Sequence, residues 1–180
     1  MKIFVSGGAK NGKSIFAQNA AKRLAGGGAL YYIATMEPHD SEDDERIRRH
    51  VADRAGMGFQ TVECPRSILD CLSSADTDAA FLLDSVTALL SNEMFPPPLY
   101  ETDALAGRRV ARQLIELSRR VRDIVFVSDF IYSDAEVFSE TTELYRRSLA
   151  GVDRALAAEC DCVVELCAGN VILHKGEIPI

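Results

Sequence analysis

The sequence predicts an α/β sandwich, in which helices pack on a sheet of parallel strands. Short apolar runs alternate with longer segments of helical periodicity along the 180 residues, a pattern typical of strands separated by helices. Two of the runs, residues 79–84 and 124–129, are continuously apolar and end in aspartate, as expected for strands buried on both faces. A glycine-rich segment, residues 7–14, joins the first apolar run to the first helical pattern.

The N-terminal third of the chain alternates between strand and helix signals. Residues 2–6 form a short β-branched run, and residues 14–26 follow with apolar positions at helical spacing and glycines at the end. Residues 29–35 predict a second strand. Residues 40–56 begin with acidic side chains, which favour a helix N-terminus, and stop at a glycine. Residues 59–65 predict a short alternating strand that a proline ends.

The rest of the chain continues the alternation. Between the two apolar runs that end in aspartate, the proline-rich residues 94–103 predict a loop and residues 104–121 a helix. A further helix is expected within residues 139–159. Residues 162–168 and 170–175 predict a hairpin that turns at Gly169 and Asn170. There is no internal repeat and no linker, so we expect a single domain over residues 1–180. The motifs described below predict that it is a nucleotide-binding catalytic domain.

Composition excludes several classes of function. The net charge of −7 offers no basic face for a nucleic-acid backbone, so we expect no nucleic-acid partner. The first residues lack the features of a signal peptide, and no apolar run approaches the length of a membrane span. A soluble, cytoplasmic protein is therefore expected. Five cysteines without a C-x-x-C pair fit neither a disulfide framework nor a zinc site and are interpreted as small buried hydrophobic residues.

The segment "GGAKNGKS", Gly7 to Ser14, matches the phosphate-loop pattern G-x-x-x-x-G-K-S between a predicted strand and a predicted helix. Its glycines let successive backbone amides and the helix N-terminus point at one anion. Lys13 is expected to reach the β and γ phosphates, and Ser14 to hold Mg²⁺ together with a carboxylate at the end of a buried strand. Asp84 is the first candidate for that carboxylate and Asp129 the second. The full predicted phosphate-binding set is Gly7, Gly8, Ala9, Lys10, Asn11, Gly12, Lys13 and Ser14.

The segment "DERIRRHVADR" places Arg46, His50 and Arg54 four residues apart, on one face of a helix. Two guanidiniums beside an imidazole favour its neutral form, which is able to attack phosphorus. The guanidiniums are then expected to bind phosphates of the nucleotide. The alternative interpretation is a solvated charged face in which Glu42 and Arg46 form an ordinary ion pair. Spacing alone leaves both interpretations open.

The chain resembles the bifunctional adenosylcobinamide kinase and adenosylcobinamide-phosphate guanylyltransferase family of cobalamin biosynthesis. The resemblance rests on "GGAKNGKS", on "LYYIAT" after the first helix, on the "RIRRH" segment and on "LLDSVTALLSN" at residues 82–92. It extends more weakly through "RRSLAGVDRALAAECDCVVELCAGN" near the C-terminus. It implies a phosphate-loop NTPase-like, RecA-like three-layer sandwich with a mostly parallel sheet.

The resemblance also implies two reactions at one nucleotide site. A nucleoside triphosphate, ATP or GTP, phosphorylates the hydroxyl of adenosylcobinamide. GTP then transfers GMP to a histidine, and adenosylcobinamide phosphate takes up the GMP to give adenosylcobinamide-GDP. His50 matches the guanylylated histidine, so the predicted catalytic residues are His50, Lys13 and Asp84, with Mg²⁺ at Ser14 and Asp84. The implied assembly is a homotrimer.

One segment departs from the family pattern. After the strand the family continues with an Asn-Glu-Val-Gly motif, whereas this chain has "SDFIYSDAEVFSE", residues 128–140. Asp129 stands where it could replace the missing carboxylate. Two alternatives to the bifunctional enzyme are therefore a small-molecule phosphate-loop kinase that lacks the histidine step, and a nucleotide-dependent binding module.

Overall fold

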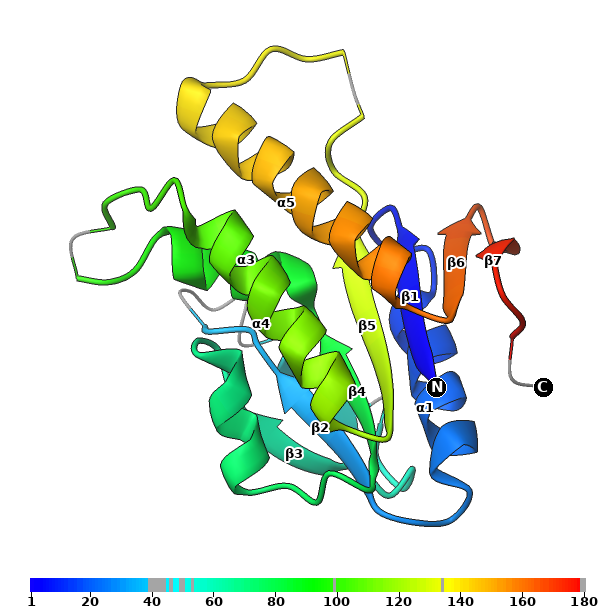
Figure 1. Ribbon diagram of the computed structural model, residues 1–180. Coiled ribbons are helices and arrows are strands. Elements are labelled where there is room, and N and C mark those ends of the chain that lie inside the picture. The colour runs from blue at the N-terminus through cyan, green and yellow to red at the C-terminus, as the bar shows by residue number, and fades with distance from the viewer. Residues whose placement is uncertain are drawn as a thin grey trace.

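The computed structural model describes residues 1–38, 45, 47–48, 51–52, 54–98, 100–133 and 135–178. Its centre is a seven-stranded sheet with the order β3-β2-β4-β5-β1-β6-β7 (Figure 1). Neighbouring strands run parallel except β6 and β7, which are antiparallel. The strands are β1 Lys2–Gly7, β2 Leu30–Ala34, β3 Gln60–Glu63, β4 Ala80–Asp84, β5 Asp123–Asp129, β6 Cys162–Cys167 and β7 Asn170–Lys175.

Helices cover both faces of the sheet and complete a three-layer sandwich (Figure 1). On one face lies α1, Lys13–Ala25, packed on β4 and β5. The opposite face carries α3 (Val86–Met94), α4 (Ala106–Arg120), α5 (Glu140–Glu159) and the short 3-10 helix η1 (Ile68–Ser73). Among the residues that the structure describes, none of the helices has the length and apolar character needed to cross a membrane.

The central strands are apolar without interruption because both of their faces are buried. In β4, Phe81 and Leu83 join the core cluster under α3, α4 and α5, whereas Leu82 joins the cluster under α1. Successive strand residues point to opposite faces, so a strand between two helical layers has no solvent side. The edge strand β7 differs, since all six of its residues are exposed.

The structure confirms the predicted strands, the helices of residues 14–26, 104–121 and 139–159, and the hairpin at Gly169. Two elements were not predicted: α3 and η1. The predicted helix of residues 40–56 lies mostly outside the described residues, although Glu45, Ile47, Arg48, Val51 and Ala52 have helical backbone. The interpretation of the cysteines is wrong in one case. Cys167 ends β6 and is exposed, whereas the other four are buried.

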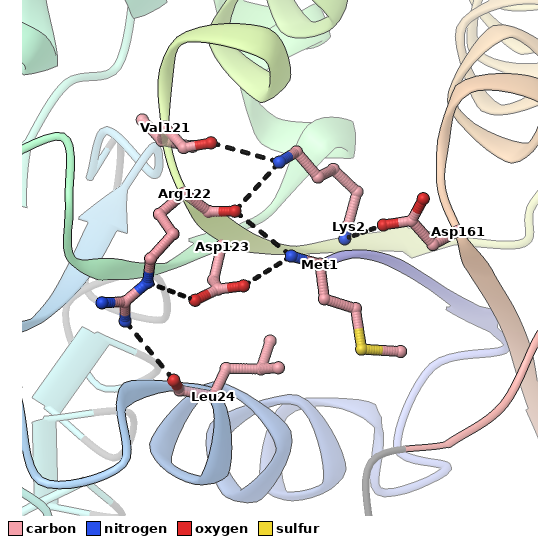
Figure 2. A network of polar contacts seen from close by, with 7 residues as sticks. All are labelled: Met1, Lys2, Leu24, Val121, Arg122, Asp123 and Asp161. Carbon is pink, nitrogen blue, oxygen red and sulfur yellow. Dashed lines mark hydrogen bonds and ion pairs between the residues drawn. The ribbon is translucent and has the colours of Figure 1, made fainter.

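The edge of the sheet away from the phosphate loop is closed by a polar network around Asp123 (Figure 2). The Asp123 carboxylate accepts hydrogen bonds from the Met1 amine at 2.5 Å and from Arg122 Nε at 2.6 Å. Lys2 Nζ donates to the carbonyls of Val121 and Arg122. Because these groups tie the start of β1 to the start of β5, they fix the register that aligns Gly7 with Asp129 at the other end.

Candidate active site

The phosphate loop connects β1 to α1, as predicted. Gly7 has φ +151°, and a Cβ at this position would lie 2.4 Å from the carbonyl oxygen of Leu166 in β6. Gly12, with φ +85°, is the N-cap of α1. Glycine is required at Gly7 because no side chain fits beside the β6 backbone, and it is favoured at Gly12 because of its left-handed conformation.

The N-terminus of α1 is open for an anion. Gly12 supplies no side-chain cap, and the first turn of α1 contains no acidic residue. The first backbone N–H groups of a helix have no intrahelical acceptor, and the helix dipole adds positive potential there. A phosphate is therefore a suitable acceptor for these groups.

Lys13 is held inside the loop by two oxygen acceptors. Its side chain is only 7% exposed. Its ammonium donates to the Gly8 carbonyl at 2.6 Å and lies 2.9 Å from Asp129 Oδ1. The cation that was predicted to reach phosphates is thus paired with the second of the two predicted carboxylates.

Asp129 is positioned by β1 and α3. It is aligned with Gly7 across the β1–β5 pairing, and its backbone N–H donates to Thr87 Oγ1 of α3 at 2.8 Å. The next residue, Phe130, donates its N–H to the Gly7 carbonyl at 2.9 Å. The end of β5 is therefore bonded directly to the first residue of the phosphate loop.

Asp84 ends β4, which is separated from β1 by β5. Its Oδ2 accepts a hydrogen bond from the Tyr32 hydroxyl at 3.1 Å. Asp84 and Asp129 thus stand at the same edge of the sheet, since both end parallel strands that are direct neighbours. The sequence could identify both strand ends, but not that β5 rather than β4 lies next to the loop, because strand order is not encoded in local pattern.

Of the three residues predicted to share a helix face, the structure describes Arg54. Its guanidinium stacks 4.0 Å from the centroid of the Tyr32 ring and donates to Thr61 Oγ1 at 3.2 Å. Tyr32 in turn bonds Asp84, so Arg54 is linked to a strand end of the site through one aromatic ring. Arg46 and His50 lie outside the described residues, and their roles stay predictions.

Residues 82–92 form a structural clamp next to the strand ends. Ser85 caps α3, and its backbone N–H donates to Thr35 Oγ1 at 2.7 Å. Thr35 Oγ1 also donates to the Ser85 carbonyl at 2.8 Å. The buried Asn92 amide donates to the carbonyls of Thr35 and Pro65 at 2.7 and 3.0 Å. The clamp explains why serine and asparagine occur in this segment at this spacing.

The ends of β2 and β3 are joined further by Arg66. Its guanidinium makes two hydrogen bonds of 2.5 Å to the carboxylate of Glu37, and its Nε donates to the Asn92 carbonyl at 3.1 Å. A bidentate pair of this kind fixes both side chains in one plane. Glu37 follows β2 and Arg66 follows β3, so this pair holds together the residues just after the two strands.

The segment after β5, which departs from the family pattern, is bonded to α5. The buried Arg146 donates to the Ile131 carbonyl at 3.0 Å, and its guanidinium lies 4.6 Å from the centroid of the Phe138 ring. The Tyr132 hydroxyl donates to Asp153 Oδ2 at 3.1 Å. Ile131, Tyr132 and Phe138 of this segment thus contact α5 beside the end of β5.

Asp153 is the main polar residue that the sequence interpretation missed. Burial raises the pKa of Asp153 to about 7; the Ser128 and Tyr132 hydroxyls oppose this shift, and the Asp129 charge adds to it. The sequence contained a signal for this burial, because Asp153 lies at helical spacing from Leu149 and Leu156 and shares the buried face of α5 with them. A carboxyl among apolar positions of a helix is uncommon without a role.

The fold and the Gly7–Ser14 loop define a phosphate-loop NTPase-like protein with a RecA-like sheet. Solved structures agree on the fold. The chain is similar to a solved ATPase domain, with a TM-score of 0.54 and 11% identity, over 97% of this chain and 76% of that one. It is also similar to a structure from Pyrococcus horikoshii OT3, with a TM-score of 0.52 and 9% identity, over 97% and 86% of the two chains.

The chain belongs to the CobU family, cobinamide kinase / cobinamide phosphate guanyltransferase, whose model matches residues 3–173. It is similar to the bifunctional adenosylcobalamin biosynthesis protein CobU of Salmonella typhimurium, with 37% identity over 97 residues. That match covers 53% of this chain and 51% of the relative, so it spans about half the length of the relative. The predicted family is confirmed.

Proposed function

We propose that this protein phosphorylates adenosylcobinamide with a nucleoside triphosphate and then transfers GMP from GTP to adenosylcobinamide phosphate, giving adenosylcobinamide-GDP. The observation that carries the proposal is the Lys13 ammonium, buried in the phosphate loop at 2.6 Å from the Gly8 carbonyl and 2.9 Å from Asp129. A lysine held there is ready to exchange these oxygens for phosphate oxygens of a bound nucleotide.

In the kinase reaction, the acceptor hydroxyl oxygen bonds to the γ phosphorus, and the bond from that phosphorus to the β-phosphate oxygen breaks. Lys13 neutralises charge that develops on the leaving diphosphate. The hydroxyl proton needs an acceptor, and Asp129 becomes available when Lys13 turns to the phosphates. Asp129 thereby takes the part of the carboxylate that is missing from the altered segment.

In the guanylyl transfer, a neutral imidazole nitrogen of His50 bonds to the α phosphorus of GTP, and pyrophosphate leaves. A phosphate oxygen of adenosylcobinamide phosphate then attacks the same phosphorus and releases the histidine. The phosphate loop stabilises the pyrophosphate in the first step because it already holds the β and γ groups. Arg46 and Arg54 are proposed to bind phosphate oxygens.

Magnesium fits the oxygen donors at this edge of the sheet. Ser14 at the start of α1 offers a hydroxyl and Asp84 a carboxylate, and hard oxygen ligands of this kind suit Mg²⁺. Within the described residues no group of three His, Cys, Asp or Glu side chains could hold a metal alone, which agrees with an ion that is held largely by nucleotide phosphates. Bound there, Mg²⁺ would neutralise phosphate charge.

The proposal extends to the setting of the enzyme. Residues 1–180 act as one catalytic domain that binds ATP or GTP, and the protein works in the cytoplasm as a homotrimer, without a nucleic-acid partner. Analytical ultracentrifugation tests the trimer, for which a sedimenting mass near the 19.7 kDa of one chain would be the contrary result.

The deciding experiment incubates the protein with Mg²⁺ and GTP labelled on the α phosphate, and then measures label that survives denaturation. Acid-labile label on the wild type and none on His50→Ala supports the histidine-GMP intermediate. An unlabelled wild type that still binds GTP would contradict it. A parallel assay with γ-labelled ATP and cobinamide tests the kinase reaction, in which Lys13→Met should lose transfer while keeping its fold.

A further inference from the structure

The backbone of Asp129 is fixed on both sides of its Cα atom by hydrogen bonds to two different elements. Its own N–H donates to Thr87 Oγ1 of α3 at 2.8 Å. The N–H of the next residue, Phe130, donates to the Gly7 carbonyl at 2.9 Å. Because peptide units are planar, fixing the two that flank a residue also fixes the direction of its Cα–Cβ bond. The two hydrogen bonds together therefore aim the Asp129 carboxylate, which lies 2.9 Å from Lys13 Nζ.

The Thr87 hydroxyl takes the place of a strand carbonyl. Strand β4 pairs with β5 as far as Asp84, which is aligned with Val127. Successive N–H groups along a strand point to opposite neighbours, so the Asp129 N–H faces the β4 side, because the Phe130 N–H faces β1. Strand β4 has already ended at this level, and Thr87 in the first turn of α3 supplies the acceptor instead.

Thr87 is itself held by α5, which lies on the same face of the sheet as α3 (Figure 1). The Tyr145 hydroxyl donates to the Thr87 carbonyl at 2.9 Å, and the Tyr145 ring packs against Phe95 with ring centroids 6.2 Å apart. Burial raises the pKa of Tyr145, and the charges of Asp129 and Asp153 add to the shift. Polar contacts thus run from α5 through α3 and β5 to the phosphate loop.

We propose that Thr87 is a positioning residue, which aims the Asp129 carboxylate at Lys13 and thereby sets how strongly this carboxylate competes with nucleotide phosphates. Tyr145 supports Thr87 by holding its carbonyl. This role rests on the proposed function, because it concerns the lysine that is proposed to bind the β and γ phosphates. Thr87 does not touch the nucleotide in this role and acts only through Asp129.

The test is a double-mutant cycle on GTP affinity, measured by isothermal titration calorimetry without Mg²⁺. Thr87→Val keeps the shape of the side chain and removes its acceptor oxygen, whereas Thr87→Ser keeps the oxygen. We expect Thr87→Val to bind GTP about threefold more tightly than the wild type, because the competing carboxylate is no longer aimed at Lys13. Thr87→Ser should retain the affinity of the wild type.

The cycle separates positioning from a general loss of structure. In the Asp129→Asn background, Thr87→Val should change GTP affinity by less than about 1.5-fold, because the charge that Thr87 aims is already absent. A residue that only supports α3 would instead weaken binding, and by the same factor in both backgrounds. Thr141→Val, at an exposed position of α5, is the matched control and should leave the affinity unchanged.

If Thr87→Val does not fold, Tyr145→Phe tests the same contacts, since it removes the hydrogen bond to the Thr87 carbonyl and keeps the ring. It should also tighten GTP binding, and only where Asp129 is present. Unchanged or weaker binding by the folded variants, or equal factors in both backgrounds, would overturn the inference even if labelling with α-labelled GTP succeeds. A gain that requires Asp129, together with a wild type that shows neither labelling nor phosphoryl transfer, would support the positioning role and contradict the proposed reactions alone. A wild type that does not bind GTP would overturn both.

Discussion

The Lys13 ammonium and the Asp129 carboxylate lie 2.9 Å apart, at the point where β1 turns into the phosphate loop and β5 ends. The side chains are 7% and 20% exposed, so solvent screens the pair only in part. A nucleotide that binds the loop has to compete with Asp129 for Lys13. The phosphate loop is therefore paired with a counter-charge from its own chain.

Asp129→Asn is expected to tighten GTP binding about three- to tenfold in the absence of Mg²⁺, because the variant removes both the competing carboxylate and its repulsion of phosphate. The same change should lower the rate of phosphoryl transfer if Asp129 accepts the hydroxyl proton. Isothermal titration calorimetry measures the first effect. Glu159→Gln, which changes net charge equally on α5, is the control, and equal or weaker binding by Asp129→Asn would contradict the competition.

Asn92→Ala is expected to lower the free energy of unfolding by about 2–6 kcal/mol. The buried amide bonds the carbonyls of Thr35 and Pro65, and the variant leaves both without that donor at roughly 1–3 kcal/mol each. Urea unfolding measures the change. Asn19→Ala, at an exposed position of α1, should change stability by less than about 0.5 kcal/mol. A loss at Asn92 no larger than this would show that the clamp contributes little.

The local sequence pattern was sufficient to predict most helices and strands and the phosphate loop. The sequence around Gly7 and Lys13 contains everything that defines a phosphate loop, because its chemistry depends on consecutive residues. Helix α3 was not predicted because its apolar residues follow β4 directly. The only sign of a helix start is Ser85, whose role as the N-cap becomes clear only in the structure.

Relations between distant residues could not be predicted. The pairing of Lys13 with Asp129 depends on β5 lying between β1 and β4. The position of Asp153 beneath Tyr132 depends on how α5 crosses the sheet. Neither follows from spacing in the chain, since both require the strand order and the packing of a helix from another part of the sequence.

The buried carboxyl of Asp153 predicts a dependence of stability on pH. Its pKa, raised to about 7 by burial, means that the folded state holds a proton that the unfolded state, with a pKa of about 3.9, has released. Stability contributed by this group is therefore complete below about pH 4 and is lost as the pH rises toward 7. Burial sets the direction of the pKa shift, the Ser128 and Tyr132 hydroxyls oppose it, and the Asp129 charge adds to it.

Asp153→Asn should accordingly be more stable than the wild type at pH 8, by about 1–3 kcal/mol, and nearly equal to it at pH 4. Urea unfolding at the two pH values gives the difference. Asp78→Asn, at an exposed position, should show the same stability difference from the wild type at both pH values. A constant difference between Asp153→Asn and the wild type across this range would contradict the raised pKa.

Asp123 predicts the opposite sign at the other end of the sheet (Figure 2). Burial alone would raise the pKa of Asp123, but hydrogen bonds from the Met1 amine and Arg122 outweigh it and lower the pKa. The stabilisation is therefore present above about pH 4, and it falls as acid protonates the carboxylate. Asp123→Asn should lower the free energy of unfolding by about 1–3 kcal/mol at pH 7.

The gap between Asp123→Asn and the wild type should close as the pH falls from 5 toward 2, since the wild type then loses the same charge. Thermal unfolding across this range measures the gap, again with Asp78→Asn as the control. Because β1 and β5 are joined here and also at Gly7 and Asp129, a loosened network should raise the hydrogen exchange of β1 without changing its register. A gap that stays constant from pH 2 to 7 would show that the Asp123 charge does not fasten these strands.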